Sequence, residues 1–153
     1  MDSYFFIPGN KLHKIDAIKS LQVSEIIIDL EDAVKFSERE EILERFKQDK
    51  SLLNYFIRIP LADEKNKVDC YYLKELMALG ARKFVFPKLN SKNDLKKIIK
   101  SLEQPIKIIL LIETPRLFLE AKEILLKYRK YFYGIGIGSH DFMSEIGGEH
   151  NLK

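Results

Sequence analysis

The chain has 153 residues, of which 46% are hydrophobic and 32% are charged, and its formal net charge is +3. This apolar content excludes a disordered chain, and the length suits one domain with a sizeable core. No stretch approaches the ~20 apolar residues of a membrane-spanning helix, and the segment MDSYFFIPGN lacks the basic region of a signal peptide. The single cysteine excludes a disulfide framework and a cysteine-based zinc site, so we expect a cytoplasmic protein.

The small basic surplus does not favour a nucleic-acid-binding protein. Many lysines neighbour acidic residues, and the aromatic residues lie inside apolar runs, where they are typical of a core. We therefore expect neither a nucleic acid nor a membrane as a partner.

Short apolar runs alternate with longer amphipathic segments along the whole chain. Most of the short runs lack regular alternation, which favours parallel strands buried on both faces. In chain order, the predicted strands are Tyr4–Ile7, Ile26–Leu30, Tyr55–Ile59, Phe84–Phe86, Ile106–Ile112 and Tyr131–Ile137.

Helical spacing of apolar residues fills the intervening segments, most clearly at Leu95, Ile98, Ile99 and Leu102. Gly80 is placed to end one helix, Ser91 to cap the next with help from Asp94, and Pro115 to occupy the first turn of a third. Strict βα alternation predicts an α/β fold, either an open doubly wound sheet or a (β/α)₈ barrel. The even spacing suits the barrel, although six strands fall short of its usual length.

Polar residues follow nearly every predicted strand, at the positions where α/β proteins collect their chemistry. Glu113 ends the apolar run IILLIE, and Asp141 follows the glycine-rich run GIGIGSH. If these two strands are neighbours, the carboxylates could share one Mg²⁺ ion. The alternatives are an N-cap role for Asp141 and an ion pair of Glu113 with Arg116 or Lys88.

Arg58 lies between apolar residues in YFIRIP and has two interpretations. It could bind a substrate carboxylate or phosphate as a planar fork, or it could form a structural bridge to Asp29, Glu31 or Asp32. The glycines of GIGIG do not have the spacing of a dinucleotide-binding loop, and they indicate close backbone approach instead.

The ordered segments FFIPGN, IIIDLEDAV, FIRIP, FVFPKLNS, IILLIET and GIGSHDF resemble the citrate lyase beta-subunit-like proteins of the HpcH/HpaI aldolase group, in the phosphoenolpyruvate/pyruvate-domain superfamily. The resemblance covers essentially the whole chain. It implies an α/β fold of the TIM-type (β/α)₈ barrel kind, truncated to about six βα units. Residues 1–153 would then form a single domain that is incomplete at its C-terminus.

The resemblance also implies a Mg²⁺-dependent carbon–carbon lyase that cleaves a 3-hydroxyacyl thioester, such as a citryl or malyl thioester of coenzyme A or an acyl carrier protein. The products would be an acyl thioester and an oxo acid. By similarity, Glu113 and Asp141 would bind the metal, Arg58 and Glu113 would contact the substrate, and Arg58, Glu31 and Asp32 would be catalytic. The resemblance also implies that the chain forms a homo-oligomer, specifically a trimer.

The chain departs from the family pattern at three places. Pro60 replaces an asparagine that usually follows the arginine motif, His140 replaces a residue that is commonly acidic, and strands seven and eight are absent. Two other functions therefore stay open: a truncated non-catalytic relative that binds a metal, an oxo acid or a partner subunit, and a class II aldolase acting on free 2-oxo acids.

Overall fold

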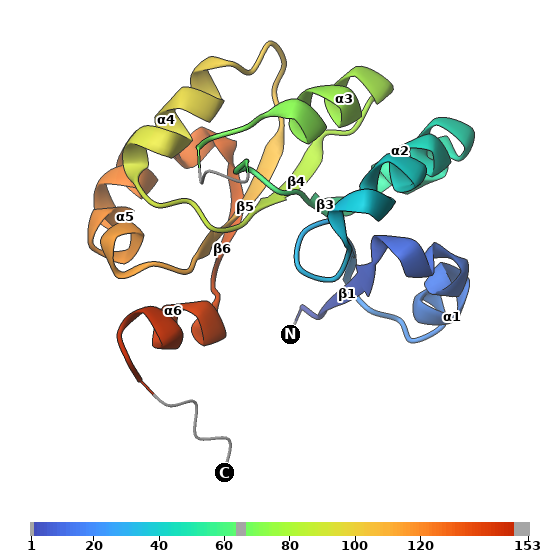
Figure 1. Ribbon diagram of the computed structural model, residues 1–153, viewed down its shortest axis with the longest axis horizontal. Coiled ribbons are helices and arrows are strands. Elements are labelled where there is room, and N and C mark those ends of the chain that lie inside the picture. Colours follow the sequence, from blue (N-terminus) through green and yellow to red (C-terminus); the bar gives the residue numbers. More distant parts are fainter. Residues whose placement is uncertain (1, 64–66, 149–153) are drawn as a thin grey trace. The chain divides into compact units, whose positions relative to one another are not determined.

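The computed structural model describes residues 2–63 and 67–148, in which strands and helices alternate as the sequence predicts (Figure 1). The chain divides into two compact units. Unit 1 comprises Met1–Pro60 and Tyr71–Val85, and unit 2 comprises Leu61–Cys70 and Phe86–Lys153.

Unit 1 contains the first four strands and three helices. The strands are β1 (Tyr4–Pro8), β2 (Glu25–Asp29), β3 (Phe56–Arg58) and β4 (Lys83–Phe86, whose last residue belongs to unit 2), and the helices are α1 (Ile15–Lys19), α2 (Arg39–Gln48) and α3 (Tyr71–Leu79). Short 3₁₀ turns, η1 (Gly9–Lys14), η2 (Phe36–Glu38) and η3 (Lys50–Asn54), connect them.

Unit 2 contains the remaining strands and helices. These elements are α4 (Lys92–Lys100), β5 (Lys107–Ile112), α5 (Pro115–Tyr128), η4 (Arg129–Tyr131), β6 (Phe132–Ile137) and α6 (Ser139–Glu145). Two of the predicted helix signals hold: Gly80 ends α3 with a φ of +114°, and Pro115 is the first residue of α5. Ser91 occupies the N-cap position of α4 as predicted, but its hydroxyl donates to the Asp94 carboxylate at 3.0 Å and accepts no backbone N–H of the helix.

The strands pair in parallel and in sequence order, which decides between the two α/β folds. The sheet order is β1-β2-β3-β4-β5-β6, and the pairs β1·β2, β2·β3, β3·β4 and β5·β6 are parallel. A doubly wound sheet reverses its strand order, whereas the strands of a TIM-type barrel follow the sequence. The fold is therefore α/β of the TIM-barrel type. The register places Asp29 beside Arg58, and Ile112 beside Ile137, at adjacent strand ends.

Burial on both strand faces is confirmed for β2 and β4 but is wrong for β1 and β6. Ile26–Asp29 and Phe84–Phe86 are buried, as are the helix residues Phe46 and Leu76 of unit 1. In contrast, Tyr4, Phe5, Phe6, Tyr133, Ile135 and Ile137 are exposed. Within residues 2–63 and 67–148, β1 and β6 are the first and last strands of the order, and these side chains are 38–61% exposed. Among the helices of the described segments, none combines the length and hydropathy needed to cross a membrane.

Candidate functional site

The loop after β2 is organised by Asp29, a carboxylate that is only 2% exposed. Its Oδ1 accepts the backbone N–H of Glu31 at 2.9 Å, and its Oδ2 accepts that of Ala33 at 3.3 Å. Asn and Asp side chains commonly form such turns with the backbone that follows them. Asp29 therefore fixes the loop that carries Glu31 and Asp32.

Arg58 forms a two-pronged ion pair with the same carboxylate. Its Nε donates to Asp29 Oδ1 at 2.8 Å and its Nη2 to Asp29 Oδ2 at 2.6 Å, a fork geometry that only arginine provides. Its Nη1 lies 3.4 Å from Glu31 Oε2 and 3.3 Å from Asp32 Oδ2. The structural bridge left open by the sequence is thus present, with all three of the candidate acids around one guanidinium.

The electrostatics of this cluster keep Arg58 charged and hold it in place. Burial alone lowers the pKa of Arg58, but the hydrogen bonds and charge of Asp29, together with the charges of Glu31 and Asp32, outweigh it and raise the pKa above its ordinary value. The guanidinium carbon also lies 5.2 Å from the centre of the Phe6 ring, in cation–π range. The result in unit 1 is an oriented cation surrounded by three carboxylates.

Glu113 in unit 2 is a buried carboxylate at the end of β5, with only 4% of its surface exposed. Its Oε2 accepts the backbone N–H of Lys88 at 2.6 Å. Lys88 has a φ of +47°, a left-handed conformation that is uncommon outside glycine. Of the two partners foreseen for Glu113, Lys88 is therefore the one in contact, through its main chain, while Arg116 lies 3.7 Å from Glu120.

Asp141 is the third residue of α6, not its N-cap, because Gly138 occupies the N-cap position. The N-cap interpretation is therefore wrong. The Asp141 carboxylate lies 3.8 Å from Lys88 Nζ, and both side chains are nearly half exposed. Lys88 thus contacts both predicted metal ligands, Glu113 through its backbone N–H and Asp141 through its ammonium group.

The β5–β6 pairing continues past the strands and brings Glu113 against Gly138. The Gly138 N–H donates to the Ile112 carbonyl at 3.0 Å. A Cβ atom built on Gly138 would lie 2.3 Å from Glu113 Cγ and 2.6 Å from its Oε1. The predicted close approach at the glycine run is therefore real at Gly138, although the sequence could not show which side chain approaches it.

Glu113 and Asp141 carry carboxylate oxygens, the donor type that a hard divalent cation prefers. Mg²⁺ is commonly held by one or two carboxylates, with water and substrate in the other positions. Of the two predicted metal ligands, Glu113 is buried and Asp141 is nearly half exposed. Over residues 2–63 and 67–148, no group of three or more His, Cys, Asp or Glu residues is placed to hold a metal.

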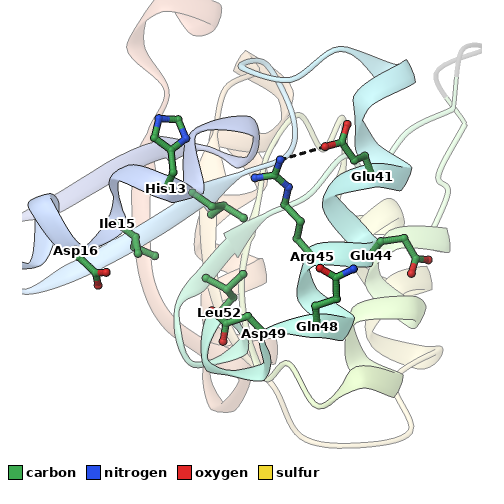
Figure 2. Close-up of a pocket in the computed structure, with 10 residues that line it drawn as sticks. His13, Ile15, Asp16, Glu41, Glu44, Arg45, Gln48, Asp49 and Leu52 are labelled. Carbon is green, nitrogen blue, oxygen red and sulfur yellow. Dashed lines mark hydrogen bonds and ion pairs between the residues drawn. The ribbon is translucent and has the colours of Figure 1, made fainter.

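Unit 1 also contains an open groove of about 620 Å³ between η1–α1 and α2–η3, which the sequence did not predict (Figure 2). It has an apolar floor that includes Leu12 and Leu52, and an acidic rim. The rim carboxylates already have partners: Arg45 Nη2 lies 3.1 Å from Glu41, Lys19 pairs with Asp16, Lys47 pairs with Glu44, and Asp49 accepts the Ser51 N–H. None of the predicted site residues lines this groove.

Comparison with known proteins identifies one family and several structural relatives. A family model described as HpcH/HpaI aldolase/citrate lyase matches residues 2–153. The citrate lyase beta subunit of Mycobacterium tuberculosis, complexed with oxaloacetate and magnesium, superposes with a TM-score of 0.76 at 20% identity, over 99% of this chain and 64% of that chain. Among curated proteins, no significant match is found.

Two further solved structures give the same fold. CitE from M. tuberculosis with magnesium, acetoacetate and coenzyme A has a TM-score of 0.74 at 19% identity, over 99% of this chain and 54% of that chain. RipC from Yersinia pestis has a TM-score of 0.74 at 20% identity, over 100% of this chain and 65% of that chain. The chain thus spans 54–65% of the length of these structures.

Proposed function

The chain belongs to the HpcH/HpaI aldolase/citrate lyase family, and from this premise we propose that it acts in a Mg²⁺-dependent carbon–carbon lyase reaction. The substrate would be a 3-hydroxyacyl thioester, such as a citryl or malyl thioester of coenzyme A or an acyl carrier protein. The products would be an acyl thioester and an oxo acid. The relatives solved with oxaloacetate and magnesium, and with acetoacetate and coenzyme A, support these substrate classes.

The observation that carries the proposal is the placement of Glu113 and Asp141 next to the same residue, Lys88. Glu113 is held at the end of β5 by the Lys88 N–H, and Asp141 lies beside the Lys88 ammonium group in the first turn of α6. In the proposed role, both carboxylates hold Mg²⁺, and Glu113 also borders the substrate. Lewis-acid polarisation of a carbonyl oxygen is the chemistry that the bound ion supplies.

Arg58 is proposed to bind the carboxylate of the oxo acid and to balance the negative charge that develops on its carbonyl oxygen. The Asp29 pair supports this role, because an oriented guanidinium loses little freedom when a ligand binds. Glu31 and Asp32 flank the same guanidinium within 3.4 Å. Their proposed role is to line the site, to accept hydrogen bonds from water and to position Arg58.

The experiment supplies the purified chain with Mg²⁺ and a set of citryl and malyl thioesters and follows release of the oxo acid. The proposal expects turnover that is abolished by EDTA and by Glu113→Gln. The charge-matched control is Glu123→Gln on α5, whose side chain is 58% exposed. Oxo-acid turnover from pyruvate and an aldehyde, without a thioester, would replace the thioester lyase with a free oxo-acid aldolase. Mg²⁺ binding without any turnover would contradict catalysis by this chain and favour a binding role.

The proposal extends to the assembly of the protein. We propose that residues 1–153 act as part of one (β/α) barrel domain and that the chain forms a homo-oligomer. The exposed apolar side chains of β1 and β6 support association, because monomeric proteins rarely leave several large apolar groups together in water.

A further inference from the structure

The buried carboxylate of Glu113 is held by the main chain of another loop. The donor is the Lys88 N–H, 2.6 Å from Oε2, and Lys88 takes up a φ of +47°. A left-handed conformation at a residue with a side chain costs free energy, so it persists where the surrounding structure imposes it. Here the donor at this strained position faces the one buried acid of the candidate metal pair.

Gly138 lies against the Glu113 side chain from a second direction and leaves the space that this side chain occupies. Its φ of −80° and ψ of 82° do not require glycine, so backbone conformation does not explain the residue. Lack of space explains the glycine, because an added Cβ would lie 2.3 Å from Glu113 Cγ, 2.6 Å from Oε1 and 2.8 Å from Cδ. The other glycines of this run differ, because a Cβ on Gly136 would meet the flexible end of Leu111 at 3.0 Å and one on Gly134 would meet Ile109 at 4.0 Å.

We propose that Gly138 and the main chain of Lys88 are positioning residues that set where the Glu113 carboxylate presents its oxygens to a divalent cation. The inference rests on the proposed metal site and adds the two residues that shape it. A methyl group at position 138 must displace Glu113, because the atoms it meets include Cγ near the root of that side chain. Groups that orient a metal ligand typically change metal affinity by about 10–100-fold when they are altered.

The test compares Gly138→Ala with Gly134→Ala, the same chemical change on the same stretch of chain. Titration calorimetry with MgCl₂ should show affinity at least about tenfold weaker for Gly138→Ala and unchanged for Gly134→Ala. Without metal, the Lys88 amide proton should resonate downfield in the unaltered chain and in Gly134→Ala. It should move upfield in Gly138→Ala and in Glu113→Gln, where the charged acceptor is displaced or neutralised.

If Gly138→Ala folds poorly, a double-mutant cycle with Glu113→Ala, measured as the free energy of unfolding, still tests the proposal. Introducing Gly138→Ala into a Glu113→Ala background should cost no stability, because the side chain that clashes is gone. If Gly138→Ala lowers the free energy of unfolding as much in the Glu113→Ala background as in the unaltered chain, the proposal is overturned. Mg²⁺ binding and a Lys88 amide shift that both stay unchanged in Gly138→Ala would also overturn it. If the unaltered chain binds no Mg²⁺, the proposed metal site fails, and the amide shift and the cycle still decide whether these residues position Glu113.

Discussion

Replacing Arg58 with lysine separates the geometry of its ion pair from its charge. Arginine engages both Asp29 oxygens, at 2.8 and 2.6 Å, and lysine can engage one at a time. A hydrogen bond between charged groups contributes about 1.5–3 kcal/mol to stability. Because the pair is shielded, with side chains 14% and 3% exposed, solvent screening reduces this contribution little. We expect Arg58→Lys to lower the free energy of unfolding by about 2 kcal/mol.

The companion substitution Arg58→Met removes the charge and leaves the Asp29 carboxylate buried with only backbone donors. Breaking a buried pair in this way costs about 3–5 kcal/mol. The matched control is Arg45→Lys, since Arg45 pairs with Glu41 on the surface of α2, with side chains 43% and 73% exposed. Exposed pairs contribute about 0–1 kcal/mol, so this control should change stability little.

Thermal unfolding followed by circular dichroism measures the series. A loss of 2 kcal/mol corresponds to a Tm lowered by roughly 4–8 °C in a chain of this size. The predicted order of Tm is the unaltered chain and Arg45→Lys highest, then Arg58→Lys, then Arg58→Met. If Arg58→Lys melts together with Arg45→Lys, the two-pronged pair does not stabilise unit 1, and the argument that Asp29 holds Arg58 ready for a ligand fails.

Three further results are expected. Lys88→Met removes the ammonium group 3.8 Å from Asp141 and should raise Mg²⁺ affinity by up to about fivefold in calorimetry; weaker binding would show that Lys88 assists the ion. The Lys35 N–H and the Asn10 amide lower the pKa of Glu38, so its contribution to stability is present above about pH 4.5 and is lost as the pH falls through the lower folded-state pKa. Urea midpoints should therefore fall less steeply below about pH 4.5 in Glu38→Gln than in the unaltered chain, and equal slopes would refute this assignment. The exposed apolar side chains of β1 and β6 predict concentration-dependent association in sedimentation velocity, which a compact monomer at every concentration would contradict.

The strands and helices could be predicted because their signals are local. Apolar runs such as Phe84–Phe86 mark strands, and Gly80 and Pro115 mark helix ends that the structure contains. The exposure of β1 and β6 could not be predicted in the same way. An apolar strand has the same sequence whether or not another layer covers it, so burial depends on neighbours that the pattern does not encode.

The candidate site residues could be selected from the sequence, whereas their contacts could not. A charged residue that ends an apolar run identifies Arg58 and Glu113 from the sequence alone. The two-pronged pair of Arg58 with Asp29 depends on strand register, which the sequence does not show. The left-handed Lys88 has no local signal, since left-handed residues other than glycine are usually Asn or Asp.

The most direct test of the account is a Mg²⁺ titration of the chain and of two nearly isosteric variants, Glu113→Gln and Asp141→Asn. Calorimetry should show one Mg²⁺ ion bound by the unaltered chain and no measurable binding by either variant, while circular dichroism shows the fold retained in all three. Unchanged Mg²⁺ affinity in both variants would contradict the account, because the two carboxylates would then not form the metal site.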